Sequence, residues 1–102
     1  MNLNEVQDSV TKWAHDRNLI DGTNSDKQFV KLIEEAGELA ECIAKGKRDE
    51  FKSELGDMMV VLNNLAVQNN TTLNECFSIA WNKIKHRKGK MIDGYFVKES
   101  DL

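Results

Sequence analysis

Apolar residues recur at every third or fourth position along most of the chain, which is the spacing of one face of an α-helix. The pattern predicts four helices, over about residues 2 to 18, 25 to 45, 49 to 69 and 72 to 86. The chain contains no proline that would interrupt them. Because the connections between the helices are short, we expect an all-α, antiparallel four-helix bundle.

Local sequence signals indicate where these helices begin and end. Ser25 and Thr72 each stand three residues before a glutamine or glutamate, the capping-box arrangement of a helix start. Gly46 is expected to end the second helix in the left-handed conformation, and Asp49 to cap the third. The boundaries therefore predict a hairpin of the second and third helices about Gly46.

The segment from about residue 88 to 102 has no helical pattern. Its Asp93-Gly94 pair, between Ile92 and Tyr95, is typical of a tight turn and predicts a small hairpin. With no linker or repeat in its 102 residues, the chain is expected to form one helical domain, residues 1 to 102, with this nonhelical tail.

Composition narrows the function classes. A net charge of −3 argues against stable nucleic-acid binding through bulk electrostatics. No apolar run approaches the roughly 18 residues of a membrane span, and the start MNLNEVQDSV lacks the basic and apolar regions of a signal peptide. We therefore expect a cytoplasmic protein without membrane contact. Cys42 and Cys76 have no CxxC spacing and are expected to be reduced packing residues.

Two carboxylate pairs flank the predicted turn: Glu35 with Glu38, and Glu54 with Asp57. Within each pair the three-residue spacing keeps both side chains on one side of a helix. Glu38 lies eight residues before Gly46 and Glu54 eight after it; Glu35 and Asp57 lie eleven before and eleven after. Since height along a helix follows residue number, the hairpin brings the two pairs level and allows the four acids to converge.

The second helix by itself also fits a solvated acidic face. Its predicted apolar stripe is Phe29, Leu32, Ile33, Ala36, Ala40 and Ile43. Glu34, Glu38 and Glu41 project roughly opposite that stripe, as in an ordinary amphipathic helix.

The third helix does not fit that interpretation. Its apolar stripe is Phe51, Leu55, Met58, Leu62 and Leu65. Glu54 lies within this stripe, and Asp57 lies at its edge. A carboxylate there is costly unless its charge is compensated, and a bound cation would compensate it. Oxygen ligands without cysteine or histidine favour Mg²⁺, with Mn²⁺ or Ca²⁺ as alternatives. Mg²⁺ is often completed by substrate phosphates, which indicates a phosphorylated substrate.

A basic segment could supply the positive charge that such a substrate needs. NKIKHRKGK, residues 82 to 90, contains five lysines or arginines. Lys83 and Arg87 are four residues apart, so both can face one target, and Arg87 can hold a phosphate through two hydrogen bonds. Asn82 can contact a base edge or a phosphate. The alternatives are a helix end stabilised by cations and an RNA-binding patch, although the segment lacks interleaved aromatic residues.

The motif EE-x-x-E followed by E-x-x-D, formed by Glu34, Glu35, Glu38, Glu54 and Asp57, resembles that of the MazG-like all-α nucleotide pyrophosphohydrolases. The stretches ELGDMMVVLNNLA and NKIKHRKGKMIDGYFVKE are similar to those of small, single-domain members, including phage-type ones. The resemblance covers most of the chain.

The resemblance implies Mg²⁺-dependent hydrolysis of an NTP or dNTP to the monophosphate and pyrophosphate by a homodimer or homotetramer. It implies metal ligation by Glu35, Glu38, Glu54 and Asp57. It implies catalytic roles for Glu34 and Glu38. It implies substrate contacts by Asn82, Lys83, Lys85 and Arg87. The preferred base is left open.

Apolar residues of the third and fourth helices predict how these helices pack. The third helix carries Val60 and Val67 opposite its main stripe, so we expect a homodimer built around the second and third helices. Phe77, Trp81 and Ile84 share one side of the fourth helix and are expected to pack in the core.

The alternative function is a non-enzymatic helical interaction module with an acidic docking face.

Overall fold

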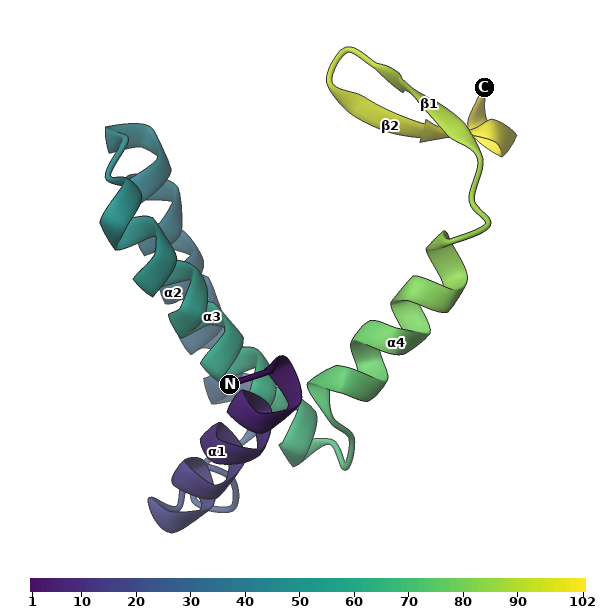
Figure 1. Ribbon diagram of the computed structural model, residues 1–102. Helices are drawn as coiled ribbons and strands as arrows, with labels where there is room; N and C mark the ends of the chain where they lie inside the picture. The colour runs from purple at the N-terminus through teal and green to yellow at the C-terminus, as the bar shows by residue number, and fades with distance from the viewer.

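The computed structural model describes residues 1–102 and contains four helices and one small hairpin (Figure 1). The elements are α1 (Leu3–Asp16), α2 (Ser25–Lys45), α3 (Arg48–Gln68), α4 (Leu73–Ile84), β1 (Gly89–Ile92), β2 (Tyr95–Lys98) and the 3₁₀ turn Glu99–Asp101. The all-α class and the four helices are as expected. No helix is both long enough and apolar enough to cross a membrane.

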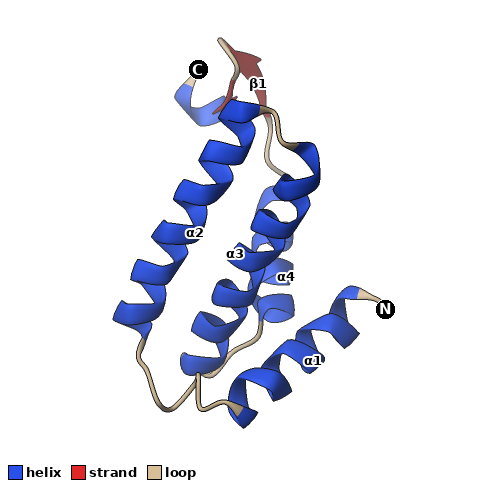
Figure 2. Cartoon of the chain, turned by 90° about the vertical axis from the view of Figure 1, so that its left-hand side faces the viewer, coloured by secondary structure: helices blue, strands red, loops and turns tan.

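Helices α2 and α3 form an antiparallel hairpin and lie side by side along their length (Figure 2). Gly46 ends α2 in the left-handed conformation, with φ at 64°, and its N–H donates back into the last turn of the helix. This confirms the turn predicted at Gly46. The packing of α2 against α3 is the most extensive contact between elements of the molecule. It positions the carboxylates described below.

The start of α2 corrects one expectation. Asn24, and not Ser25, is the N-cap: its side-chain oxygen accepts a hydrogen bond of 2.9 Å from the backbone N–H of Lys27. Asparagine caps a helix as well as serine does, so the cap lies one position earlier while the helix spans the predicted residues 25 to 45. The N-cap of α4 is Thr72 as predicted, and its hydroxyl accepts from the N–H of Glu75.

Two other helix ends differ from the prediction. Helix α3 begins at Arg48 without a side-chain cap, so Asp49 lies inside its first turn, where its charge still favours the positive helix end. Helix α4 ends at Ile84, two residues before the predicted end at His86. The predicted hairpin in the tail is confirmed: Ile92 pairs with Tyr95.

Buried amide side chains fix α3 against its neighbours. The Asn63 amide donates to the hydroxyl of Thr11 on α1 at 3.0 Å, and the Asn64 amide donates to Gln28 on α2 at 3.4 Å. Both asparagines are buried. Because an unpaired buried amide would be costly, these contacts specify how α1 and α2 sit on α3.

Helix α4 diverges from the other helices after its first turns, so that α4 and the hairpin form an arm (Figure 1). The expectation that Phe77, Trp81 and Ile84 pack in a core is wrong for this chain, because all three are exposed. Only eight residues of the chain are buried. The radius of gyration is 16.3 Å, against about 13 Å for a compact domain of this length. The single chain therefore leaves an open angle between α3 and α4.

The turn at Gly46 generates a stability prediction. A β-carbon added there would touch nothing within 4 Å, so Gly46→Ala costs only its left-handed backbone, about 1–2 kcal/mol. Gly37 lies inside α2 with equally open space, and Gly37→Ala is expected to stabilise by about 0.5–1 kcal/mol. Urea unfolding followed by circular dichroism measures both. Equal effects of the two substitutions would contradict a special conformation at Gly46.

Candidate metal centre

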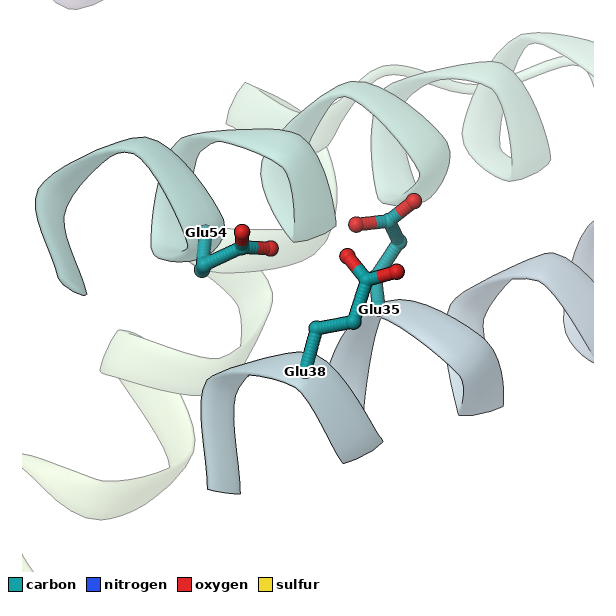
Figure 3. Close-up of side chains that lie close together, drawn as sticks. All are labelled: Glu35, Glu38 and Glu54. Atoms are coloured by element: carbon teal, nitrogen blue, oxygen red, sulfur yellow. The ribbon is translucent and has the colours of Figure 1, made fainter. Parts of the chain in front are cut away.

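Three carboxylates from two helices meet between α2 and α3. Glu35 and Glu38 extend from α2 and Glu54 extends from α3 toward them (Figure 3). One carboxylate oxygen from each lies within 4.8 Å of the other two. The convergence of Glu35, Glu38 and Glu54 expected from their distances to Gly46 is therefore present in the fold.

Burial makes this cluster unlike a surface patch. Glu35 is only 7% exposed and Glu54 is half-buried. The Oε2 atoms of both are buried and have no hydrogen-bond partner. Buried carboxylate oxygens without a partner are costly, so these two atoms are available to a ligand that provides positive charge.

The rotation of α2 about its axis explains why Glu35 is buried. Phe29, Ile33 and Ile43, members of the predicted apolar stripe, are 56–62% exposed. The side of α2 that packs on α3 contains Glu35 and Cys42 as its buried residues. These three members of the stripe thus lie away from α3, whereas Leu32 and Ala36 are half-buried, because apolar residues occur on more than one side of α2.

Electrostatics within the cluster follow from the proximity of like charges. The pKa of Glu54 is raised above its ordinary value, first by a side-chain hydrogen bond to Glu38, then by burial and by the charges of Glu38, Asp57 and Glu35. The raised pKa means that the folded protein favours the protonated form of Glu54 more than the unfolded chain does. A cation bound to the cluster would oppose all of these effects.

Lys31 is a neighbour of the cluster that the sequence interpretation missed. Its Nζ lies 3.2 Å from Glu35 and 3.6 Å from Glu34. The Glu35 carboxylate raises the pKa of Lys31 and so keeps it charged. The spacing of four residues to Glu35 and three to Glu34 is the sequence signal that could have identified it. Lys31 contacts Glu35 and leaves the Glu38–Glu54 contact without a cation.

Glu34 and Asp57 lie beside the cluster but outside the group of converging oxygens. Glu34 is exposed and pairs with Lys31. Asp57 is exposed on α3, one turn after Glu54, close enough that its charge contributes to the raised Glu54 pKa. Both remain predictions as functional residues.

The predicted substrate contacts are all on the arm. Asn82 and Lys83 lie in the last turn of α4, and Lys85 and Arg87 follow it; all four are exposed. The amide oxygen of Asn82 accepts a hydrogen bond of 3.0 Å from Lys85. Because α4 diverges from α2 and α3 (Figure 1), these residues are not beside the carboxylates of their own chain.

The donor set fits a hard divalent cation. It offers carboxylate oxygens only, two of which are buried without a partner. The nearby Cys42 thiol does not join the group, and burial raises its pKa, which disfavours the thiolate form that binds softer metals. All-oxygen ligands suit Mg²⁺, Mn²⁺ or Ca²⁺.

Comparison with known proteins identifies the domain. The model of the MazG nucleotide pyrophosphohydrolase domain matches residues 25–92, which include α2, α3, α4 and the three clustered glutamates. The match therefore covers the metal centre and the basic segment together.

A curated relative is also similar. The chain is 45% identical over 67 residues to an uncharacterized 18.2 kDa protein in the rep-hol intergenic region of Haemophilus phage HP1. The similarity covers 66% of this chain and 41% of that relative, so the chain spans less than half of the relative's length. No solved structure matches the chain.

The crowded carboxylates generate a stability prediction for the metal-free protein. Glu54→Gln removes one of the repelling charges, so we expect a higher Tm than the wild type in EDTA at neutral pH. Glu41→Gln is the matched control, since Glu41 is exposed on α2 and pairs with Lys45. Calorimetry in EDTA measures both variants. A lower Tm for Glu54→Gln would contradict a repulsive cluster.

The advantage of Glu54→Gln should depend on pH. Because the folded-state pKa of Glu54 lies above its ordinary value of 4.5, the folded protein holds this proton more tightly than the unfolded chain. The wild type therefore loses stability as the pH rises from about 4.5 through the raised pKa. The Tm difference between variant and wild type should be small at acid pH and larger at neutral pH.

Proposed function

Because the chain belongs to the MazG nucleotide pyrophosphohydrolase family, we propose that it hydrolyses a nucleoside triphosphate, NTP or dNTP, to the monophosphate and pyrophosphate with Mg²⁺. The observation that supports this most is the meeting of Glu35, Glu38 and Glu54 with two buried oxygens left unpaired. A family member with intact acidic motifs and a converged cluster has the groups that the reaction needs.

The metal would be held by Glu35, Glu38 and Glu54, with Asp57 available from the next turn of α3. Mg²⁺, with Mn²⁺ as a substitute, supplies charge neutralisation at the phosphate oxygens and a more acidic water. Lys31 pairs with one oxygen of Glu35 and leaves the other oxygen without a partner. The helix hairpin keeps the ligands in place before the substrate binds.

Of the two candidates for the general base, Glu38 is favoured over Glu34. Glu38 is exposed and its carboxylate lies at the cluster beside Glu54, whereas Glu34 is paired with Lys31. A base must reach the attacking water that lies near the α-phosphorus. Glu38 can therefore take up the water's proton.

Positive charge for the leaving pyrophosphate would come from the basic segment. Arg87 offers a planar, permanently charged group that suits phosphate oxygens, and Lys83, Lys85 and Asn82 would assist it. These residues lie on the arm, away from the carboxylates of their own chain (Figure 1).

The alternative of an acidic docking module is less well supported. A docking surface presents its charges to solvent, as Glu34 and Glu41 do. Glu35 instead turns toward α3 and is almost completely buried. A protein partner could not reach it, whereas a small cation could.

The activity prediction compares the wild type with a cluster variant. Pyrophosphate release is measured over a panel of NTPs and dNTPs, with Mg²⁺ and with EDTA. We expect metal-dependent release from at least one nucleotide and a loss of about a hundred-fold or more in kcat/KM for Glu38→Ala. Glu41→Ala, one turn further along α2 and outside the cluster, should retain activity. No release from any nucleotide with Mg²⁺ or Mn²⁺ would rule out the proposed reaction.

A second prediction concerns the basic segment. Arg87→Ala should lower kcat/KM by roughly ten- to a hundred-fold, the usual effect of removing a charged hydrogen-bond donor, without weakening Mg²⁺ binding in titration calorimetry. Lys98→Ala, an exposed cation on β2, is the control and should have little effect. Equal losses for both variants would indicate a general effect of net charge.

A further inference from the structure

Lys31 is the one cation that forms ion pairs with the acidic motifs of the metal centre. Its Nζ lies 3.2 Å from Oε1 of Glu35 and 3.6 Å from Oε2 of Glu34. The other salt bridges of the chain lie elsewhere, so Glu38 and Glu54 have no cationic partner. The only fixed positive charge at the centre is therefore held by Glu34 and Glu35.

The place of the Lys31 ammonium group is one that a metal ion could occupy. Glu34 and Glu35 each turn an oxygen toward the same Nζ. Mg²⁺ is commonly held by only one or two carboxylates, with water completing its shell, so a divalent ion shared by Glu34 and Glu35 would need these same two oxygens. Because like charges at such short distances repel, the ammonium group and a metal ion exclude each other there.

The other oxygen of Glu35 belongs to a different position. The Glu35 side chain is 9% exposed, and its Oε2 is buried without a hydrogen-bond partner, as is Oε2 of Glu54. Glu35, Glu38 and Glu54 point toward one another (Figure 3), with one oxygen of each within 4.8 Å of the other two. No lysine or arginine pairs with Glu38 or Glu54, so a divalent ion meets no competing cation at this position.

Helix geometry keeps Lys31 in place without any metal. Lys31 lies on α2 three residues before Glu34 and four before Glu35, the spacings at which side chains of one helix meet. The packing of α2 on α3 buries Glu35 and so restricts the carboxylate with which Lys31 pairs. This cation is part of the chain, and its presence does not depend on the concentration of metal in solution.

We propose that Lys31 fills the position of a second metal ion at Glu34 and Glu35, so that each chain takes a single divalent ion, held by Glu35, Glu38 and Glu54. Lys31 is then a positioning residue, since it acts through the two carboxylates and not on the substrate. Glu34 holds Lys31 and is not a metal ligand. The inference rests on the metal centre of the proposed function but not on the reaction.

Counting bound Mn²⁺ tests the number of ions without any measurement of activity. Electron paramagnetic resonance reports the free ion during a titration with Mn²⁺. We expect one bound ion per chain for the wild type and two for Lys31→Met, which keeps a long side chain but removes its charge. Two ions in the wild type, or one in Lys31→Met, would overturn the proposal.

Lys45→Met is the matched control. Lys45 pairs with Glu41 on the same helix at the same four-residue spacing, so its removal also frees a carboxylate, but one outside the cluster. This variant should bind one ion. Circular dichroism should give the same helix content for both variants, because Lys31 and Lys45 are exposed. A second ion in Lys45→Met would show that any freed carboxylate binds Mn²⁺ and would count against a special position at Lys31.

Two further variants locate the second ion. Lys31→Arg retains the positive charge and should bind one ion. Glu34→Gln combined with Lys31→Met removes one of the two carboxylates that Lys31 contacts and should return the count to one. Because the two ions of Lys31→Met share Glu35, magnetic coupling between them should broaden their signals. Two ions in either of these variants, or an uncoupled pair in Lys31→Met, would refute the assignment.

Pyrophosphate release separates this inference from the proposed reaction. If the ion counts are as expected but no nucleotide is hydrolysed, the proposed reaction fails and the role of Lys31 stands. If a nucleotide is hydrolysed and Lys31→Met still binds one ion, the role of Lys31 fails and the reaction stands. No Mn²⁺ bound by the wild type or any variant would overturn both the metal centre and this inference.

Discussion

The structure depends on holding like charges together. Glu35, Glu38 and Glu54 repel one another, yet the antiparallel packing of α2 on α3 brings their oxygens within 4.8 Å. The glycine turn at Gly46 sets the register of the two helices, and the buried amide contact between Asn64 and Gln28 maintains it further along. The repulsion is an energetic cost of the metal-free protein, and it is also what makes the centre attractive to a divalent cation.

Lys31 limits that cost without removing it. It pairs with one oxygen of Glu35, while the other oxygen of Glu35 and one of Glu54 remain buried and unpaired. The raised pKa of Glu54 has the same origin. The protein thus compensates the charge only in part, and groups with perturbed pKa values and incomplete pairing are concentrated at functional sites.

The open angle between α3 and α4 is the second constraint. A chain of this length has too few elements to cover both sides of α3, and α1 covers only part of the side opposite the carboxylates. The apolar residues of the arm consequently remain exposed in one chain. Family membership rests on residues 25–92, which include both the hairpin of α2 and α3 and the arm, whereas the acidic cluster lies on the hairpin alone.

Much of the fold and of the candidate site could be predicted from the sequence, because these features depend on residues that are close together in the chain. The four helices, the turn at Gly46, the cap at Thr72 and the tail hairpin follow from capping and turn residues. The meeting of Glu38 with Glu54 follows from equal distances to that turn. Lys31 was missed although its spacing to Glu34 and Glu35 is visible, because helix-surface lysines are common and usually solvated.

The sequence by itself determined the helix spans, the hairpin and the level of the acids, since each depends on hydrogen bonds within a few residues. Only the tertiary structure decided which side of α2 faces α3 and where α4 points. Because apolar residues such as Ile33 and Ile43 lie on another side of α2, the sequence allowed more than one side to pack against α3. In the structure the side with Glu35 and Cys42 is the buried one. The direction of α4 depends on long-range contacts that one chain provides only at its base, so no local pattern could have indicated it.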